Sequence, residues 1–383
     1  INMNEQKNLF LAIAISIAII VVFQYFIPVQ QTSNIETNNI NNDVDINNDV
    51  DINNKVSNNE NLDSLIKIES KKDLIAKNDR ILINTPQIKG SINLKGAVLD
   101  DIILSQYYQT TDNLKNINLF YPDGTQNPYF IEFEWISNNK NIKTKLPNTE
   151  TIWKSNDKEL TPNNSVTLYW TNEDNITFTI NFEIDENFMF TVSQEVNNKS
   201  NKSLNIYARQ TIKRIYKPDT TDWFISHEGL VANINDRLYE KKYKTLKKDC
   251  DVEKYKIVDG KKISLQEPEC NLSSKEAWLG FTDKYWMSVL IPNPNEPINI
   301  NYRHGNNGRD SYRTGYVGQI FNISPGETIS YSGKVFAGAK KLDILSNYLD
   351  KLSIPRFTDA IDWGWFAFLT KPVSYAINWF YSY

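Results

Sequence analysis

The sequence predicts a mainly β protein, a large antiparallel β-sandwich with membrane-seeking segments at its two ends. Three observations predict this architecture. Apolar and polar residues alternate over many short runs, as in strands that bury one face. Aromatic residues are frequent, with 20 Tyr, 18 Phe and 9 Trp, and they supply the bulk of one large core. A continuous apolar run stands near the start of the chain, and an aromatic segment stands near its end.

The apolar run over residues 9–27 predicts a transmembrane anchor. Only Ser16 and Gln24 interrupt it. At a helical rise of about 1.5 Å per residue, a run of this length just crosses a hydrocarbon core of about 30 Å. A cleaved signal peptide is the alternative, but bulky residues stand where a peptidase needs small ones. Lys7, together with the scarcity of basic residues after the run, places residues 1–8 in the cytoplasm and the main body outside.

Residues 28–73 are rich in Asn and Asp and predict a disordered tether. The stretch contains a tandem hexapeptide, with residues 43–48 repeated as residues 49–54. Too few large apolar groups occur there to offset the conformational entropy that ordering would cost. A calcium loop is the alternative, but the glycine and the closing glutamate of an EF-hand are missing.

Residues 74–338 show the period-2 pattern of strands and form the predicted sandwich. Ile and Phe alternate with Thr, Asn and Glu over residues 176–184. Residues 185–187 then indicate a turn, and the alternation resumes at Phe188, so the two runs predict a hairpin. Many strands and almost no amphipathic helix favour a sandwich. Further strand-like runs lie at residues 88–95, 131–136, 165–170, 204–212, 286–291 and 328–336.

Residues 339–355 are an exception to the strand pattern. Leu342, Leu345, Leu349 and Leu352 recur at helical spacing, which places them on one face of a helix. We expect this helix to pack on the sandwich.

Residues 356–383 predict an amphipathic helix at the membrane interface. The segment is densely aromatic, and aromatic side chains favour the boundary between acyl chains and water. After Lys371 and Pro372, a good helix start, apolar and polar residues separate onto opposite faces. A core helix of the sandwich is the alternative. The predicted interface residues are Trp363, Trp365, Phe366, Phe368, Trp379 and Phe380.

Net charge and cysteine content exclude two classes of protein, those that bind nucleic acid and those built on a disulfide scaffold. The 42 basic and 46 acidic residues give a net charge of −4, which offers no electrostatic footprint for nucleic acid. Cys250 and Cys270 are too few for a disulfide scaffold and leave at most one bridge. Whether the two sulfurs form that bridge or stay free thiols is open at this stage.

A lysine-rich stretch at residues 237–262 is a candidate for partner binding. We single out Lys241, Lys242 and Lys244 for contact with acidic lipid headgroups or a partner subunit. Interspersed acidic residues offset most of this charge, so a solvated hairpin is the alternative.

No catalytic residue, cofactor site or metal site is predicted. The chain has two histidines. His227 stands beside Glu228, a pairing suited to acid–base chemistry, but residues 226–229 indicate a polar turn. His304 lies in a Gly- and Asn-rich stretch that predicts a loop. Neither histidine has a partner at metal-ligand spacing, and a sugar-epimerising or carbohydrate-binding protein remains only the alternative.

The two ends and one internal motif resemble a known family. Residues 3–9 before a single anchor, and residues 360–366 with 369–372 near the end, are similar to the YidC/Oxa/Alb family of bacterial membrane insertases. The most specific match is residues 278–286, Trp-Leu-Gly-Phe-Thr-Asp-Lys-Tyr-Trp, followed by Ile-Pro at 291–292. It resembles the alphaproteobacterial form of the family's periplasmic domain, although Glu-Ala stands just before it where the family commonly has Gly-Gly.

This resemblance implies a first transmembrane helix, a periplasmic sandwich of the galactose-mutarotase type, and an interfacial helix that leads into five further transmembrane helices. Those five carry the family's insertion groove, so we expect this chain to be truncated before the transmembrane core. The implied function is a membrane-protein insertase or chaperone of the bacterial inner membrane, without a cofactor. The implied partners are nascent inner-membrane proteins, the Sec translocon with its auxiliary subunits, and lipids.

Overall fold

The computed structural model describes residues 68–381, apart from residues 111, 113, 140–142, 217, 219, 221–226, 259–260, 265 and 365–366. The predicted anchor at residues 9–27, and residues 28–67 of the predicted tether, lie outside the described residues. Residues 71–73, at the end of the predicted tether, are helical instead, because Lys71 is bonded to the body. Within the described part, no helix is long and apolar enough to cross a bilayer.

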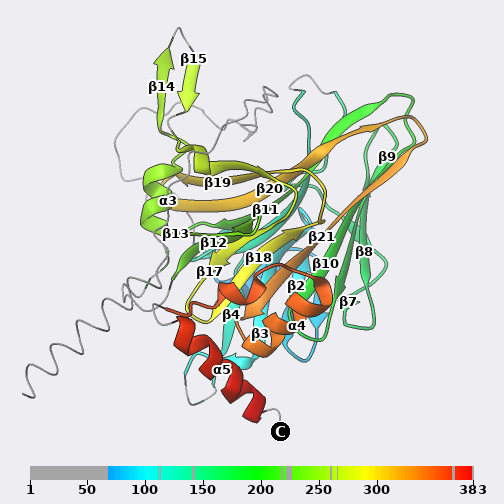
Figure 1. Cartoon of the computed structure of the whole chain (residues 1–383). Helices are drawn as coiled ribbons and strands as arrows, with labels where there is room; N and C mark the ends of the chain where they lie inside the picture. Colours follow the sequence, from blue (N-terminus) through cyan, green and yellow to red (C-terminus); the bar gives the residue numbers. More distant parts are fainter. Residues whose placement is uncertain are drawn as a thin grey trace, which may run out of the picture. The chain divides into compact units, whose positions relative to one another are not determined.

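A ten-stranded sheet forms one layer of the body (Figure 1). Its order is β16-β19-β20-β11-β5-β3-β2-β1-β7, and β4 pairs with β3. All of these pairings are antiparallel except β1 with β7. The strands are β1 (Arg80–Asn84), β2 (Ile88–Asn93), β3 (Val98–Tyr108), β4 (Asn116–Phe120), β5 (Tyr129–Ile136), β7 (Glu159–Leu160), β11 (Leu204–Arg214), β16 (Asn271–Ser274), β19 (Ile298–Asn306) and β20 (Asp310–Ile323).

A nine-stranded antiparallel sheet forms the second layer. Its order is β13-β12-β17-β18-β21-β10-β9-β8-β6. The strands are β6 (Lys154–Ser155), β8 (Val166–Thr171), β9 (Ile176–Ile184), β10 (Met189–Asn198), β12 (Gly229–Ile234), β13 (Arg237–Lys242), β17 (Ala277–Thr282), β18 (Trp286–Pro292) and β21 (Thr328–Ala339).

Side chains of the two sheets meet in one core, which confirms the predicted sandwich. Phe182 of β9 packs edge-on against Phe133 of β5, with ring centroids 5.4 Å apart. A polar contact also crosses between the layers, because the Gln194 Nε2 of β10 donates to the backbone oxygen of Glu134 at 3.1 Å. The core is therefore apolar with a hydrogen-bonded polar seam, as buried amides require.

The predicted strands are found where the alternation is clean. β9 spans the predicted run, and β10 pairs antiparallel with it, with Phe190 opposite Ile184. The predicted hairpin is therefore confirmed. β12 and β17 were not predicted, because every residue of both strands is buried. A strand buried on both faces shows no alternation.

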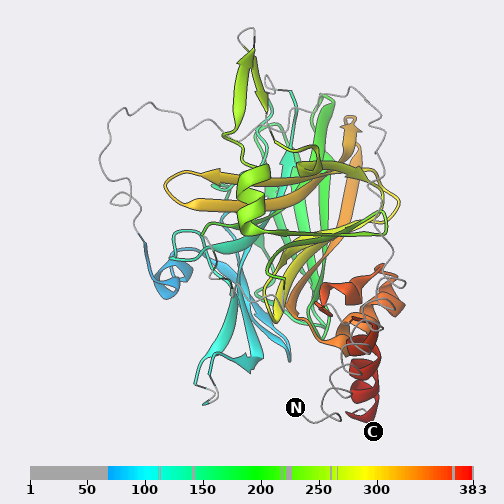
Figure 2. The same ribbon diagram turned by 60° about the vertical axis from the view of Figure 1, so that its left-hand side comes forward.

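The two cysteines form a disulfide, which settles the question left open by the sequence. The Cα atoms of Cys250 and Cys270 are 5.6 Å apart, and both residues are buried. The bridge joins the end of α3 (Tyr243–Asp249) to the short 3₁₀ helix η2 (Pro268–Cys270). It closes the base of a small hairpin, β14 (Tyr255–Val258) with β15 (Lys261–Ser264), that projects from the body (Figure 2).

The described chain enters the sandwich through a short helix, α2 (Lys71–Ile75). The Lys71 amino group lies 2.7 Å from Asp101 and also donates to Asn118 Oδ1 at 2.7 Å. Burial lowers the pKa of Lys71, although Asp101 acts in the opposite direction. This buried ion pair fixes α2 to the strands β3 and β4.

A helix is present where the leucine spacing predicted one. α4 (Leu342–Leu352) packs against the sandwich and against the 3₁₀ helix η3 (Phe357–Ala360). Its buried face is Ile344, Leu345 and Tyr348. Of the four leucines, Leu345 is fully buried, Leu342 and Leu349 are half-buried, and Leu352 is exposed.

Candidate functional site

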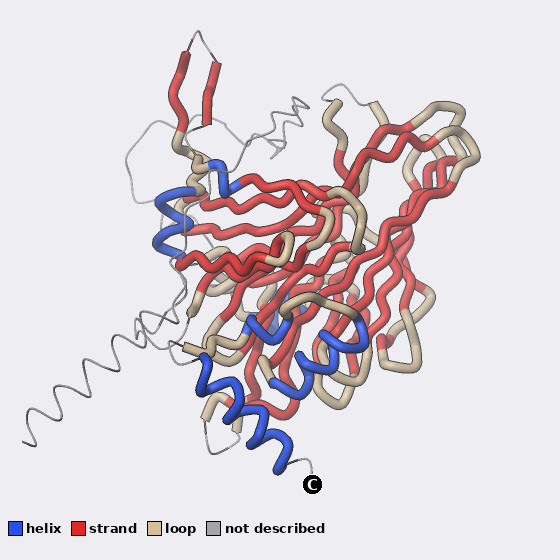
Figure 3. The backbone as a smooth tube through the Cα atoms, viewed as in Figure 1, coloured by secondary structure: helices blue, strands red, loops and turns tan. Residues whose placement is uncertain are grey.

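A fifteen-residue helix, α5 (Ala367–Tyr381), is the candidate site. It lies outside the sandwich at the end where α4 and η3 also gather (Figure 3). The predicted start at Lys371 and Pro372 was wrong, since the helix begins at Ala367 and contains Pro372. Pro372 stands early in the helix, where its missing N–H removes one intrahelical hydrogen bond.

The apolar side chains of α5 face away from the protein. We call Leu369, Val373, Ile377 and Phe380 the apolar face of α5, because a period of about 3.6 residues places them on one side of the helix. Their exposed fractions are 56%, 48%, 52% and 71%, and Phe368, which is 69% exposed, lies outside that face. A core helix would bury these side chains, so the core-helix alternative is excluded. A helix that turns apolar residues outward requires a partner other than water.

The opposite face of α5 is held to η3 by an ion pair. Ala367, Lys371 and Ser374 are half-buried. The Lys371 amino group lies 2.6 Å from Asp359 Oδ1, and the Arg356 Nε lies 2.8 Å from Asp359 Oδ2. Burial alone would raise the pKa of Asp359, but its bonds to these two cations lower it. We call Asp359 with its two cations the Asp359 clamp.

The linker before α5 is fixed by a second aspartate and by Trp363. Asp362 Oδ2 accepts the backbone N–H of His227 at 2.6 Å, and its Oδ1 accepts that of Gly364 at 2.8 Å. The Trp363 indole donates to the Thr358 carbonyl at 3.1 Å. Its ring stacks on Tyr375 of α5 with centroids 6.4 Å apart. The orientation of α5 is thus determined by several specific bonds.

The structure separates the predicted interface residues into groups. Phe380 lies on the apolar face of α5, and Phe368 is exposed on another side of the same helix. Trp363 is half-buried and belongs to the linker contacts instead. Trp365 and Phe366, and the side chain of Trp379, lie outside the described residues.

The three predicted partner-binding lysines do not form one patch. Lys241 lies 2.8 Å from Glu269 and 3.5 Å from Asp249. Burial works against its charge, but these two carboxylates raise the pKa of Lys241. Lys242 and Lys244 are exposed, at the end of β13 and on α3. The lysine-rich stretch is not a simple hairpin, because it contains β13 and α3 before β14.

The two histidines are held by other groups. His304 lies in β19, so the predicted loop was wrong, because Ile298, Ile300 and Tyr302 face inward and extend the strand to Asn306. The His304 ring is buried, with its Nε2 2.9 Å from Asp310 Oδ1. His227 Nε2 is 2.7 Å from the Leu230 carbonyl. Among the described residues, no group of three His, Cys, Asp or Glu side chains is placed to hold a metal ion.

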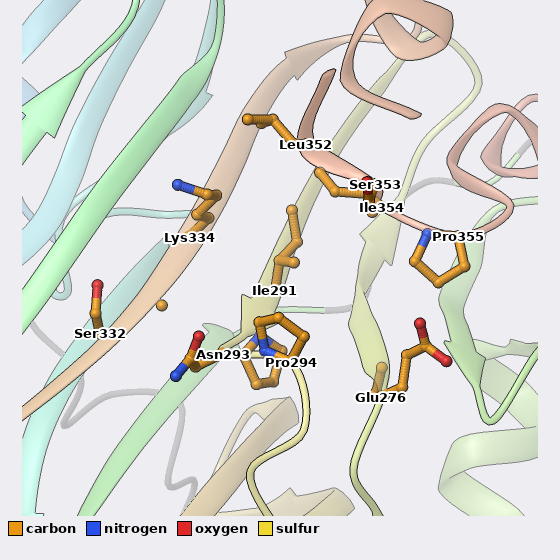
Figure 4. Close-up of a pocket in the computed structure, with 13 residues that line it drawn as sticks. Glu276, Ile291, Asn293, Pro294, Ser332, Lys334, Leu352, Ser353, Ile354 and Pro355 are labelled. Carbon is orange, nitrogen blue, oxygen red and sulfur yellow. The ribbon is translucent and has the colours of Figure 1, made fainter. Parts of the chain in front are cut away.

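A small hollow lies where the loop after α4 crosses β18 and β21 (Figure 4). Its water-accessible volume is about 130 Å³, below the roughly 300–1,000 Å³ of typical ligand pockets. Figure 4 shows Lys334 and Glu276 on opposite sides of it. Neither histidine lines it.

The internal motif at residues 278–286 positions the C-terminal helices. The Trp278 indole donates to the Pro355 carbonyl at 2.8 Å, in the loop between α4 and η3. Asp283 accepts two hydrogen bonds from the buried Arg214, at 2.8 and 2.9 Å. Arg214 was not singled out from the sequence, since a lone arginine at the end of a strand carries no local signal.

Comparison with known proteins gives consistent family matches. A profile of the YidC periplasmic domain matches residues 80–376. The membrane protein insertase YidC of Rickettsia bellii is 37% identical over 303 residues, which are 79% of this chain and 51% of that protein. The Rickettsia felis protein of the same name is 38% identical with the same coverage. The chain therefore spans about half the length of the curated relatives it matches.

Solved structures give weaker similarities. A galactose mutarotase-like protein from Lactobacillus casei aligns with a TM-score of 0.42 and 10% identity, over 67% of this chain and 99% of that one. A galactose mutarotase related enzyme from Lactobacillus acidophilus gives a TM-score of 0.39 and 10% identity, with 67% and 97% coverage. The mutarotase type of the sandwich stays a prediction.

The profile covers most of the described chain, and the Rickettsia relatives are more than one-third identical to it. The motif at residues 278–286 lies inside the matched range, where the structure gives Trp278 and Asp283 defined bonds. This chain belongs to the YidC family of membrane protein insertases.

Proposed function

We propose that this chain is the membrane-anchored periplasmic part of an insertase that assists the insertion and folding of bacterial inner-membrane proteins. It acts alone or with the Sec translocon, and its partners are nascent membrane proteins, Sec subunits and lipids. The outward apolar face of α5 is the observation that carries this proposal. It gives the periplasmic body a second attachment to the bilayer, in addition to the predicted anchor at residues 9–27.

The energetics favour a lipid position for α5. Each side chain of the apolar face is about half exposed or more, and moving it into the acyl boundary contributes on the order of 1 kcal/mol. The transfer of these four side chains together outweighs the cost of leaving a few polar contacts at the surface. The half-buried face with Lys371 and Ser374 points to the sandwich, as expected for a helix lying in the interface plane.

The disulfide supports an exported body. Cys250 and Cys270 are bonded, and disulfides persist in the bacterial periplasm but are rare in the cytosol. We therefore place residues 1–8 in the cytoplasm and the sandwich in the periplasm. Insertion itself moves apolar helices into lipid while their backbones stay hydrogen-bonded, so it requires no cofactor from this chain.

The role of this part is docking rather than insertion. Lys242 and Lys244 are exposed on the same edge of the body and are candidates for contact with an acidic partner such as an auxiliary Sec subunit. The exposed ends of β13 and α3 present both charges outside the sandwich core.

A chimera tests the proposal. Residues 1–381 replace the matching half of the Rickettsia bellii insertase, and the chimera is reconstituted in vesicles with a ribosome-bound model membrane protein. We expect protease-protected insertion at a rate similar to that of the parent. A matched variant carries Leu369→Ser, Val373→Ser and Ile377→Ser, and should lose most of this activity.

The control variant carries serines at three exposed residues of the sandwich, Leu82, Ile152 and Ile320. It should insert as well as the unmodified chimera. If the chimera is folded and disulfide-bonded but inactive, the insertase proposal is wrong. If both triple variants are equally active, α5 has no part in the function.

A further inference from the structure

A second group of exposed apolar and basic residues lies at the end of strand β3 and in the turn between β17 and β18. We call Tyr108, Leu114, Lys115, Lys284 and Tyr285 the aromatic tip. The exposed fractions of Tyr108, Leu114 and Tyr285 are 42%, 84% and 57%. Both lysines are exposed beside them.

Backbone pairs and ring contacts place the two parts of the aromatic tip beside each other. Tyr108 lies opposite Asn116 in the β3–β4 pair, and the Gln109 N–H donates to the Lys115 carbonyl at 2.8 Å. The neighbouring ring of Tyr107 lies 5.1 Å from that of Trp286. Trp286 in turn lies 6.0 Å from Tyr285. Tyr107 packs against the core, on the side of β3 opposite to Tyr108, so its ring places the β3–β4 hairpin next to the β17–β18 turn while Tyr108 stays on the outer side.

The aromatic tip lies at the same end of the body as α5. The Tyr285 carbonyl accepts the N–H of Lys340, which leads into α4, at 2.9 Å. Thr282, at the end of β17, pairs with Gly229. Two residues before Gly229, His227 donates to Asp362 in the linker of α5. Figures 1 and 2 both show the β3–β4 strands and α5 extending toward one end, with the β14–β15 hairpin at the opposite end.

We propose that the aromatic tip is a second contact with the bilayer surface, so that the sandwich rests on the membrane through α5 and through this tip. The inference depends on the proposed function, because α5 defines which end faces lipid. Tyr and Trp prefer the headgroup level, and the lysines favour anionic phosphates. The Lys284 amino group lies 5.1 Å from the centre of the Tyr285 ring, so the cation and the aromatic ring are presented together.

The charge of the tip agrees with an anionic lipid surface. Lys115 and Lys284 supply two positive charges. Asp283, next to Lys284, is engaged by Arg214, and Asp112 at the hairpin accepts the Thr110 hydroxyl. Asp112 offsets one of the lysines, so apolar contact by Leu114 and Tyr285 supplies the larger part of the affinity.

The β14–β15 hairpin provides a matched comparison. Ile257 is 67% exposed, which is between the values of Tyr285 and Leu114, and lysines also surround it in sequence. The β14–β15 hairpin projects from the end opposite α5 (Figure 2). If exposure alone determined lipid contact, a probe at Ile257 would behave like a probe at the aromatic tip.

Site-directed spin labelling tests the inference. The whole chain, with its native disulfide, receives one added cysteine at a time, as Leu114→Cys, Tyr285→Cys, Ile257→Cys or Ile377→Cys. Each labelled chain is reconstituted in vesicles of phosphatidylethanolamine and phosphatidylglycerol. The ratio of collision rates with oxygen and with a water-soluble nickel chelate reports lipid contact. We expect this ratio at positions 114 and 285 to exceed that at 257 by about twofold or more.

The outcomes are distinguishable. Lipid-like ratios at 377 and at both tip positions support the inference. A lipid-like ratio at 377 with water-like ratios at 114 and 285 overturns it and leaves the proposed function standing. Water-like ratios at all four positions overturn both. The unfolding midpoint of each labelled chain confirms that it is folded, and Tyr108→Cys supplies a further tip reporter if one label perturbs the turn.

Discussion

Two consecutive helices use their apolar faces in opposite ways. α4 buries Ile344, Leu345 and Tyr348 against the sandwich, and its Tyr348 ring lies 6.0 Å from Phe336 of β21. α5 turns its apolar face outward and attaches by the Asp359 clamp. Both helices are amphipathic in sequence, so periodicity alone does not distinguish a core helix from an interfacial one.

The difference lies in what each polar face contacts. The charged residues of α4, Asp343, Asp350 and Lys351, are exposed, whereas Lys371 of α5 is bonded to Asp359 of the body. A helix whose charged side is bonded to its own protein must direct its apolar side elsewhere. The comparison thus predicts different energetic roles for the two helices, core stability for α4 and membrane position for α5.

The largest expected effect is at the buried face of α4. Leu345→Ala leaves a cavity in a fully buried position and should lower the free energy of unfolding by about 2–5 kcal/mol. Ile377→Ala, on the apolar face of α5, should change it by less than about 0.5 kcal/mol. Urea unfolding of the detergent-solubilised chain, followed by tryptophan fluorescence, measures both. Equal losses in the free energy of unfolding would show that α4 and α5 contribute alike to the stability of the body, against this prediction.

A smaller effect is expected at Tyr348. Its hydroxyl donates to Asp185 Oδ2 at 2.6 Å and accepts the Phe188 N–H at 3.2 Å. Tyr348→Phe leaves both partners without this bond and should cost about 1–3 kcal/mol. Tyr375→Phe on α5 is the matched control and should cost almost nothing. If Tyr348→Phe leaves the free energy of unfolding unchanged, α4 is held by apolar packing alone.

The Asp359 clamp should affect orientation more than stability. Asp359→Asn weakens the bonds to Lys371 and Arg356. Because these pairs are partly exposed, we expect the free energy of unfolding to fall by less than about 1 kcal/mol. A spin label at Ser374→Cys should nevertheless become clearly more mobile. Asp343→Asn, next to the exposed Lys341, is the control and should leave the label unchanged.

The smallest expected effect is a pH dependence of the same clamp. The pKa of Asp359 is lowered from the ordinary value of 3.8, so its contribution is complete above 3.8 and is lost as pH falls through the lower, folded-state value. The Ser374 label should keep constant mobility from pH 8 to pH 5. Mobility should rise only below pH 3.8. A change in label mobility near neutral pH would show that a group other than Asp359 holds α5 in place.

Local patterns predicted a large part of the fold. β9 and β10 were predicted because each buries one face, and the apolar face of α5 was predicted because a 3.6-residue period is visible within one segment. β12 and β17 were missed because burial on both faces removes the alternation. The start of α5 was misplaced because Pro372 suggests a helix start, although the helix tolerates it inside.

The attachments of α5 could not be predicted from the sequence. Lys371 and Asp359 are 12 residues apart, and His227 and Asp362 are 135 residues apart. Such pairs form only because folding brings separate elements together. The local sequence pattern carries no information on the distance between them. The disulfide could not be predicted for the same reason, since the spacing of Cys250 and Cys270 permitted either a bridge or two free thiols.

A cysteine scan of α5 tests the central claim most directly. Residues 367–380 of the reconstituted chain are labelled one at a time, and the oxygen-to-nickel accessibility ratio is recorded along the helix. The account predicts a helical period with lipid-like maxima at Leu369, Val373 and Ile377 and minima at Lys371 and Ser374. A flat, water-like profile, or maxima at Lys371 and Ser374, would contradict it.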